Sequence, residues 1–338
     1  MTVTPPLTVK DLTTDQEVRW CPGCGDFAIL NAIKAFLPEL NIPREELVFI
    51  SGIGCSSRLP YYMNTYGMHS IHGRAPAIAT GLATTRPDLD VWVVTGDGDA
   101  LSIGGNHLIH ALRRNVDITI LLFNNQIYGL TKGQYSPTSE MAKVTKSTPF
   151  GSLEHPFNPL SLALGAEAGF VARTHDMDRK HMMEVFRRAH AHKGASFVEI
   201  YQNCNVFNDG AFEAITGKDH RADMLIPLVH GEPIRFGSDG QFGVVMDPDG
   251  SVEVVEVATV GEGALLVHDE HKENPGLAFQ LSRLSRGPFE PTPIGVFRDV
   301  EHDEYGEQMA EQIATATERR GAGDFDALLR SGSSWTVS

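Results

Sequence analysis

Residues 90–99 read DVWVVTGDGD, and the class of the fold can be inferred outward from this stretch. Its branched apolar residues predict a short buried strand, which ends where glycine and aspartate take over. A second apolar run at 118–123 ends in Asn124-Asn125, and a helical pattern at 105–114 lies between the two strands. Ligands of open parallel sheets bind at the carboxyl ends of the strands, so the aspartates and the asparagines are expected to face one crevice.

The alternation of strands and helices continues on both sides of this unit. Asp26 is in position to cap a helix that runs to about residue 40, and a buried strand follows at 47–50. Small residues predict a helix at 75–82. Further along, the pattern predicts helices at 159–168 and 179–192 and strands at 170–173 and 196–201. This order indicates an α/β fold, a mostly parallel sheet with helices on both faces.

The character of the chain changes after about residue 205. The turn signals at 238–240 and 248–250, each ending in Asp-Gly, bound β-rich runs at 241–246 and 251–257. We therefore expect a main domain over residues 1–230. Residues 231–338 are expected to form a C-terminal extension with β-hairpins and a terminal helix.

Composition excludes several classes of protein. The 338-residue chain carries a net charge of −15, which argues against binding to nucleic acid through a broad basic surface. No run approaches eighteen apolar residues, and the first residues lack a basic-then-apolar signal pattern, so no membrane association is expected. A cytoplasmic protein is therefore expected. Its four cysteines then indicate metal or redox chemistry rather than disulfides.

The acidic stretch after the first strand has the composition of a magnesium–diphosphate site. Glycines let a backbone approach a phosphate closely, and an aspartate with an asparagine supplies hard oxygen ligands. A Gly-Asp-Gly sequence alone is more often a turn. Together with the asparagine pair it is similar to the motif of thiamine diphosphate enzymes. By that resemblance Asp97, the Asn125 side chain and the Ile127 carbonyl bind Mg²⁺.

The cysteines allow three interpretations. Cys21 and Cys24 form a CxxC turn, Cys55 follows the strand at 47–50, and Cys204 follows the last predicted strand. A redox pair would leave Cys55 and Cys204 unused, and a structural zinc site usually pairs two CxxC turns. A [4Fe–4S] cluster tolerates irregular spacing, but spacing alone does not separate it from zinc. A neighbouring thiamine site, which needs an electron acceptor when it oxidises a 2-oxo acid, favours the cluster.

Over about residues 15–230 the chain resembles the β subunit of a 2-oxoacid:ferredoxin oxidoreductase, most closely the 2-oxoglutarate type. The resemblance rests on WCPGCG, GIGCSSR, IHGRA, TGDGD, the stretch at 114–139 and the lone Cys204. It implies that the four cysteines bind one [4Fe–4S] cluster. It also implies a set of residues along the thiamine cofactor: Ile53, Gly54, Cys55, Ser56, His72, Gly96, Asp97, Gly98, Asp99, Asn125, Gly129 and Leu130.

The resemblance implies a reaction and partners. A 2-oxo acid and CoA would give acyl-CoA and CO₂, succinyl-CoA if the acid is 2-oxoglutarate, while electrons leave singly through the cluster to ferredoxin. The pyrimidine-binding domain and its catalytic glutamate would come from a separate α subunit, in an α₂β₂ assembly. The C-terminal extension is expected to pack on that partner.

Two residues are candidates for direct catalytic roles. By resemblance His72 approaches the thiamine or the substrate carboxylate. Arg58 is either an ordinary surface arginine or a partner for a second substrate carboxylate, and the latter role would favour 2-oxoglutarate over pyruvate.

Alternative functions are the same chemistry on pyruvate or branched-chain 2-oxo acids, a non-oxidative thiamine decarboxylase subunit with structural zinc, and a non-enzymatic zinc-binding module.

Overall fold

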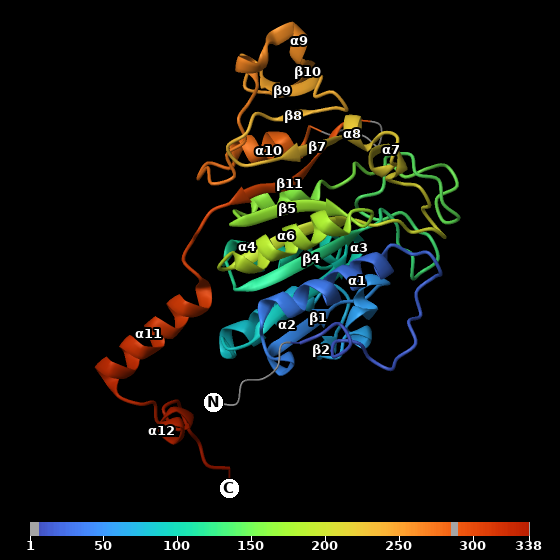
Figure 1. Ribbon diagram of the computed structural model, residues 1–338. Helices are drawn as coiled ribbons and strands as arrows, with labels where there is room; N and C mark the ends of the chain where they lie inside the picture. Colours follow the sequence, from blue (N-terminus) through green and yellow to red (C-terminus); the bar gives the residue numbers. More distant parts are fainter. Residues whose placement is uncertain (1–6, 285–289, 338) are drawn as a thin grey trace.

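The computed structural model describes residues 7–284 and 290–337. At its centre is an eight-stranded sheet with the strand order β2-β1-β3-β4-β6-β5-β11-β7 (Figure 1). The first six strands along the chain run parallel, and β11 is antiparallel to β5. The strands are β1 (Leu47–Ser51), β2 (Tyr66–His69), β3 (Asp90–Gly96), β4 (Ile118–Asn124), β5 (Phe170–His175), β6 (Ala195–Tyr201), β7 (Leu225–Leu228) and β11 (Thr292–Asp299). The predicted α/β class is confirmed.

Helices cover both faces of the sheet because the strands are apolar on both faces. Trp92 and Val94 of β3 join one core cluster, whereas Val91 and Val93 join the other, as the alternation of side chains along a strand requires. Two helices contribute to the first cluster, α1 (Asp26–Phe36) and α6 (Arg179–Ala191). The second includes residues of α2 (Ala75–Thr85), α4 (Gly105–Arg113), α5 (Pro159–Gly165) and α10 (Gly276–Ser282).

The central sheet does not end at residue 230. Its β11 comes from the region predicted as a separate extension, and it pairs with β5 on one side and β7 on the other. The sequence of β11, TPIGVFRD, hides this role because proline, glycine and arginine interrupt the apolar run. Arg298 is nevertheless buried there, and its Nη1 donates to the Ala168 carbonyl at 2.8 Å.

The rest of the extension lies outside the main sheet. A three-stranded sheet of β8 (Arg235–Phe236), β9 (Phe242–Met246) and β10 (Val252–Glu256) lies beyond β7, and its antiparallel β9–β10 pair confirms the predicted hairpin (Figure 1). The helix α11 (Tyr305–Arg320) has no buried residue and projects from the body towards α12 (Phe325–Leu329). Among the described helices, none has the length and apolarity needed to cross a membrane.

One local prediction was wrong. Asp26 does not cap α1: the N-cap is Gly25, Asp26 is the first helical residue, and no side chain bonds to the end of the helix. The acidic stretch after β3 begins a short helix, α3 (Asp97–Leu101).

Candidate cofactor and cysteine site

The acidic stretch and the asparagine pair lie together at the carboxyl ends of β3 and β4. These two strands are paired in parallel, with Gly96 opposite Phe123. The Thr138 hydroxyl, from the long loop after β4, lies 2.6 Å from Asp97 Oδ2 and 2.9 Å from Asn124 Oδ1. Ser136 Oγ also donates a hydrogen bond to Asp97 Oδ2. The loop therefore closes over the acidic end of β3.

Asp97 is a buried carboxylate whose environment suits a cation. Burial raises the pKa of Asp97 to about 6, although hydrogen bonds from Ser136 and Thr138 oppose the shift. In the described ranges, no basic side chain forms an ion pair with it. A bound divalent cation would offset the cost of burying this charge, so Asp97 fits the role of a metal ligand.

The two asparagines after β4 have different partners. Asn124 follows Asp97 by 27 residues and Asn125 follows it by 28, so spacing does not choose between them. Asn124 Oδ1 lies near Thr138 and accepts from the Gln126 N–H, and its Nδ2 donates to Glu199. Asn125 Oδ1 accepts a single bond, from the Ile127 N–H at 3.2 Å, so it keeps acceptor capacity for a metal ion.

Asp99 organises the loops around the site with its side chain. Its Oδ1 accepts from the Ile53 N–H at 3.0 Å and from the Gly73 N–H at 2.7 Å. The same oxygen lies 2.5 Å from His72 Nδ1, and Thr95 donates to Oδ2. Both carboxylate oxygens thus bind groups of the protein and hold the loops at 53, 72 and 73 around the end of β3.

His72 is oriented by this carboxylate. Its side chain is 38% exposed, and a bond from Nδ1–H to Asp99 leaves Nε2 as the nitrogen that can accept or deliver a proton outside the protein core. His69, which lies nearby in sequence, is different. Burial and the neighbouring Arg58 lower the pKa of His69, and its ring packs edge-on against Tyr61. These contacts favour a packing role for His69 over proton transfer.

Two glycines shape the backbone around the acidic stretch. A Cβ on Gly98 would lie 2.1 Å from the ring of Tyr128, whose hydroxyl donates to the Gly98 carbonyl, so only glycine fits under this ring. Gly54 has φ +141°, and a Cβ there would meet no atom within 4 Å. The backbone at Gly54 is therefore exposed to an approaching group. Ser56 lies close by, with its Oγ 3.4 Å from the Cβ position of Gly96.

The loops that carry the four cysteines are bound to one another. The Gly25 N–H, next to Cys24, donates to the Asn203 carbonyl beside Cys204 at 3.1 Å. Trp20 Nε1, next to Cys21, donates to the Cys55 carbonyl at 2.7 Å. The predicted convergence of the CxxC turn with Cys55 and Cys204 is present.

Among the described residues, no three of the cysteine sulfur atoms all lie within 4.8 Å of one another. Four thiolates at about 2.3 Å from one zinc ion would lie about 3.8 Å apart. The ranges 7–284 and 290–337 contain one group of three or more Cys, His, Asp or Glu side chains whose ligand atoms all lie within 4.8 Å, and it contains no cysteine. In an iron–sulfur cubane each thiolate binds a different iron atom, so the sulfurs stand farther apart. The spread favours the cluster.

Cys24 and Cys55 are free cysteines in an environment that disfavours the thiolate. Burial raises the pKa of Cys55 to about 12, and it also raises the pKa of Cys24 strongly; nearby Asp26 adds to both shifts. A metal centre supplies the positive charge that stabilises deprotonated sulfur. Gln202 Nε2 lies 3.3 Å from Cys24 Sγ, in position to donate a hydrogen bond to such a thiolate.

Gly129 follows the asparagine pair along the chain and lies beside two of the cysteines. A Cβ at this position would be 3.5 Å from Cys55 Sγ and 3.7 Å from Cys204 Sγ. Its neighbour Leu130 is 49% exposed, as expected for an apolar wall that faces a ligand. The Cys55 loop and the segment after Asn125 therefore border both the cysteines and the region around Asp97 and Asn125.

Arg58 lies close enough to Cys55 for its charge to lower the pKa of that thiol, against the larger effect of burial. Its Nε donates to the Tyr62 hydroxyl at 3.1 Å, and it lowers the pKa of His69 after the larger effect of burial. In the part of the chain that the structure describes, no carboxylate forms an ion pair with Arg58. An arginine held by a neutral partner keeps its charge available for an anion.

Several residues of the site were not expected from the motifs. Ser136 and Thr138 contact Asp97, Gln202 contacts Cys24 and Asn125, and Trp20 holds the Cys55 loop. Serine, threonine and glutamine are common in loops and give no periodic signal. A hydroxyl-rich stretch such as YSPTS after the asparagine pair was the available clue.

Comparison with known proteins places these features in a family. Residues 52–200 match the thiamine pyrophosphate enzyme family, C-terminal TPP-binding domain. The 2-oxoglutarate oxidoreductase subunit KorB of Mycobacterium tuberculosis is 59% identical over 98% of this chain and 89% of its own length. The β subunit of the 2-oxoacid:ferredoxin oxidoreductase 1 of Aeropyrum pernix is 45% identical over 60% of this chain and 63% of its own length.

A solved structure extends the similarity to the whole fold. The 2-oxoglutarate:ferredoxin oxidoreductase of Magnetococcus marinus, with 2-oxoglutarate, coenzyme A and succinyl-CoA bound, matches with a TM-score of 0.76 and 34% identity. The match covers 98% of both chains, including the region after residue 230. The chain therefore belongs to the β subunits of the 2-oxoacid:ferredoxin oxidoreductases and carries their thiamine diphosphate-binding fold.

Proposed function

We propose that this chain is the β subunit of a 2-oxoglutarate:ferredoxin oxidoreductase, also called 2-oxoglutarate synthase. It would convert 2-oxoglutarate and CoA to succinyl-CoA and CO₂ and pass two electrons, one at a time, to ferredoxin. The relative from Mycobacterium tuberculosis is named for 2-oxoglutarate, and the solved neighbour contains that acid together with CoA and succinyl-CoA. The free charge of Arg58 supports the same substrate.

The observation that carries the proposal is that Cys55 lies both among the cysteines and next to the glycine loop at 52–54. Its sulfur lies beside Gly129, its carbonyl is bound by Trp20, and the two residues before it form the open glycine loop. Electrons leaving a substrate held at that loop would thus have a sulfur ligand of the cluster as their nearest acceptor. Cys21, Cys24, Cys55 and Cys204 would bind a single [4Fe–4S] cluster.

The proposed magnesium ligands follow from the motif resemblance and from the oxygen atoms that remain free to bind a cation. Asp97, Asn125 Oδ1 and the Ile127 carbonyl would bind Mg²⁺ and so hold the diphosphate, while Ser136 and Thr138 fix the carboxylate. Thiamine diphosphate supplies the electron sink that decarboxylation of a 2-oxo acid requires. His72, held by Asp99, would carry a proton at Nε2, and Arg58 would bind the distal carboxylate of the substrate.

The chain would act only with a partner. Family resemblance implies an α subunit that supplies the pyrimidine-binding domain and its glutamate, in an α₂β₂ complex. The exposed arm formed by α11 and α12 supports an extensive contact with that subunit. Residues 231–338 would then serve two purposes, completing the sheet through β11 and binding the partner through the arm.

Low-temperature EPR of the anaerobically purified complex tests the proposal. With 2-oxoglutarate and CoA we expect reduction of one [4Fe–4S] cluster per β chain, as with dithionite. Pyruvate should reduce it at least tenfold more slowly. Reduction by pyruvate at an equal rate would assign the same chemistry to a different substrate, and a colourless protein without iron or sulfide would overturn the cluster assignment.

A further inference from the structure

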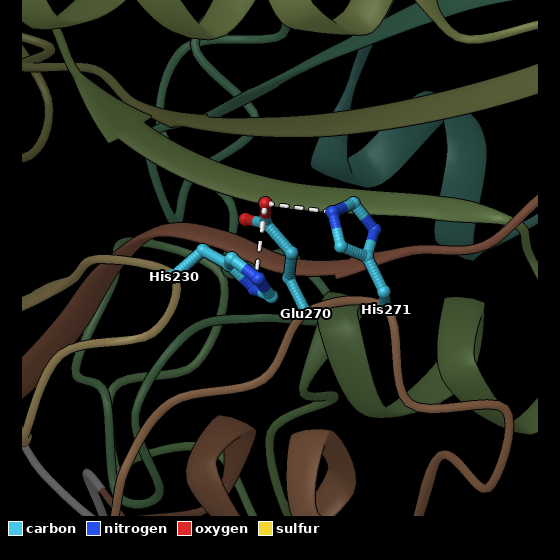
Figure 2. A group of neighbouring side chains, drawn as sticks. All are labelled: His230, Glu270 and His271. Atoms are coloured by element: carbon cyan, nitrogen blue, oxygen red, sulfur yellow. Dashed lines mark ion pairs between the residues drawn. The ribbon is translucent and has the colours of Figure 1, made fainter.

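A cluster of two histidines and a glutamate lies on residues that the proposed function does not use. Figure 2 shows His230, Glu270 and His271 pointing towards one another. Glu270 Oε1 lies 3.9 Å from His230 Nδ1 and 3.5 Å from His271 Nε2. The three ligand atoms all lie within 4.8 Å of one another. The Glu270 side chain is 5% exposed, whereas the two rings reach the surface.

Backbone hydrogen bonds bring the three residues together. The segment after β7 is bound to the segment before Glu270, because the Gly231 N–H donates to the His268 carbonyl and the His268 N–H donates to the Glu232 carbonyl. The Asp299 N–H, at the end of β11, donates to the Glu270 carbonyl at 2.8 Å. The cluster is therefore formed by segments whose backbones are held in place.

Neighbouring groups orient His271 and Glu270. His271 Nδ1 lies 2.7 Å from the Asp299 carbonyl oxygen, which can only accept, so Nδ1 carries a proton. In neutral His271 the lone pair of Nε2 then points to Glu270 Oε1, and two acceptors face each other at 3.5 Å. Arg188 Nη1 donates to the other oxygen, Oε2, at 2.9 Å and leaves Oε1 for the histidines. A cation between the facing acceptors would satisfy both.

The separations suit a small divalent ion. Bonds of about 2.0–2.1 Å to nitrogen and oxygen at tetrahedral angles give ligand atoms about 3.3 Å apart. Small side-chain rotations would bring the separations of 3.5 and 3.9 Å to this value. Support of a ligating histidine by a backbone carbonyl and of a carboxylate by arginine is typical of metal sites.

We propose that His230 Nδ1, Glu270 Oε1 and His271 Nε2 bind one Zn²⁺ ion, with water in the remaining position. Imidazole and carboxylate ligands suit zinc, and no thiolate is involved. Asp269 Oδ1 lies 3.8 Å from His230 Nδ1 but accepts from the His271 N–H, so it supports the loop.

The proposed site is far from the thiamine and cysteine site. Asp299 of β11 is paired with Phe170, the first residue of β5. The start of β5 lies on the side of the sheet opposite the carboxyl ends of β3 and β4. A seven-residue strand such as β4 separates the two edges by about 20 Å. The zinc ion would therefore be structural, joining the loop after β7 to the segment at 268–271 on the outer part of the sheet.

Zinc binding by the full-length chain tests the proposal. Protein purified anaerobically with its iron intact is dialysed against EDTA and then equilibrated with Zn²⁺, and zinc and iron are counted separately. We expect one zinc per chain, and a zinc X-ray absorption spectrum with nitrogen and oxygen neighbours and no sulfur. In the double variant His230→Gln/His271→Gln binding should weaken at least 100-fold. His220→Gln, on an exposed turn between α7 (Glu213–Thr216) and α8 (Arg221–Met224), should bind as the wild type does.

The melting temperature separates loss of the site from loss of the fold. In EDTA the double variant and the wild type should melt at similar temperatures, and zinc should raise the melting temperature of the wild type and of His220→Gln only. If the double variant is unstable, His271→Ala alone is used, since His271 is exposed. Equal zinc binding in wild type and variant, sulfur neighbours in the spectrum, or no binding at 100 µM Zn²⁺ would overturn the proposal. None of these readouts depends on thiamine diphosphate or 2-oxoglutarate.

Discussion

At the scale of single residues, the proposed contact between Arg58 and the distal carboxylate of the substrate can be tested by substitution. Replacing Arg58 with leucine should raise the KM for 2-oxoglutarate at least tenfold, because a charge-assisted bond to the distal carboxylate contributes roughly 1.5–3 kcal/mol. The KM for 2-oxobutyrate, which lacks that carboxylate, should change by less than threefold. Steady-state kinetics of the reconstituted complex gives both values. If the KM rises equally for both substrates, Arg58 does not recognise the distal carboxylate and serves only as a partner of Tyr62.

The two asparagines after β4 should differ when they are truncated. Asn125→Ala removes a proposed metal ligand, so we expect the concentration of Mg²⁺ needed for half-maximal activity to rise at least tenfold while the melting temperature changes little. Asn124→Ala removes the donor to buried Glu199 and should lower stability by about 1–3 kcal/mol instead. Mg²⁺ titrations and urea denaturation of both variants separate the two effects. The opposite assignment, with Asn124 as ligand, requires the reverse pattern.

At the scale of elements, a buried ion pair joins β5 to β6 behind the site. Arg173 Nε lies 2.7 Å from Glu199 Oε2, both side chains are almost fully buried, and Glu199 Oε1 accepts from Asn124 at the end of β4. Arg173→Met would leave an unpaired buried carboxylate and should destabilise the fold by about 3–5 kcal/mol. The double variant Arg173→Met/Glu199→Gln should recover more than half of that loss, since glutamine keeps the bond to Asn124. Urea denaturation measures both, and equal losses in the single and double variants would contradict a role for the charge.

The contact between α6 and β3 should make stability depend on pH. His190 Nε2 lies 3.4 Å from Asp90 Oδ2, and its ring stacks on Trp92. The bond to Asp90 raises the pKa of His190 above its ordinary value, although burial opposes the shift. The folded chain therefore holds this proton more tightly than the unfolded chain, and the stabilisation is fully present below about pH 6.5 and is lost as pH rises through the folded pKa.

Replacement of His190 tests this dependence. The difference in the free energy of unfolding between the wild type and His190→Gln should fall by up to about 1 kcal/mol from pH 6 to pH 8, a modest value because the pair is partly exposed. Urea denaturation at both pH values, followed by tryptophan fluorescence, gives the difference. A difference that stays constant with pH would mean that the ring acts only by stacking.

At the scale of the whole molecule, elements with a local apolar pattern could be predicted from the sequence. Contacts between segments that are far apart in the sequence could not. Strands such as β3 and β4 are apolar runs that end in polar residues, so their type and even their common edge could be predicted. β11 could not, because buried Arg298 interrupts its apolar pattern and its partners lie more than 60 residues away. The Ser136 and Thr138 contacts to Asp97, and the pairing of His230 with Glu270, likewise depend on how loops return to the sheet, which no local spacing encodes.

The arm formed by α11 and α12 has no buried residue in either helix. On α12, Phe325 is 70% exposed and Leu329 is 67% exposed, and their four-residue spacing puts them on one face. If this face packs on the partner subunit, Phe325→Asp/Leu329→Asp should weaken assembly at least tenfold, since burying two such side chains contributes roughly 3 kcal/mol or more. Asp326→Ala, on the same helix, should assemble normally, and the isolated variant chains should all melt as the wild type does. Analytical ultracentrifugation of the complexes measures the affinity; undiminished assembly of the double variant would mean that the arm binds something other than the partner subunit.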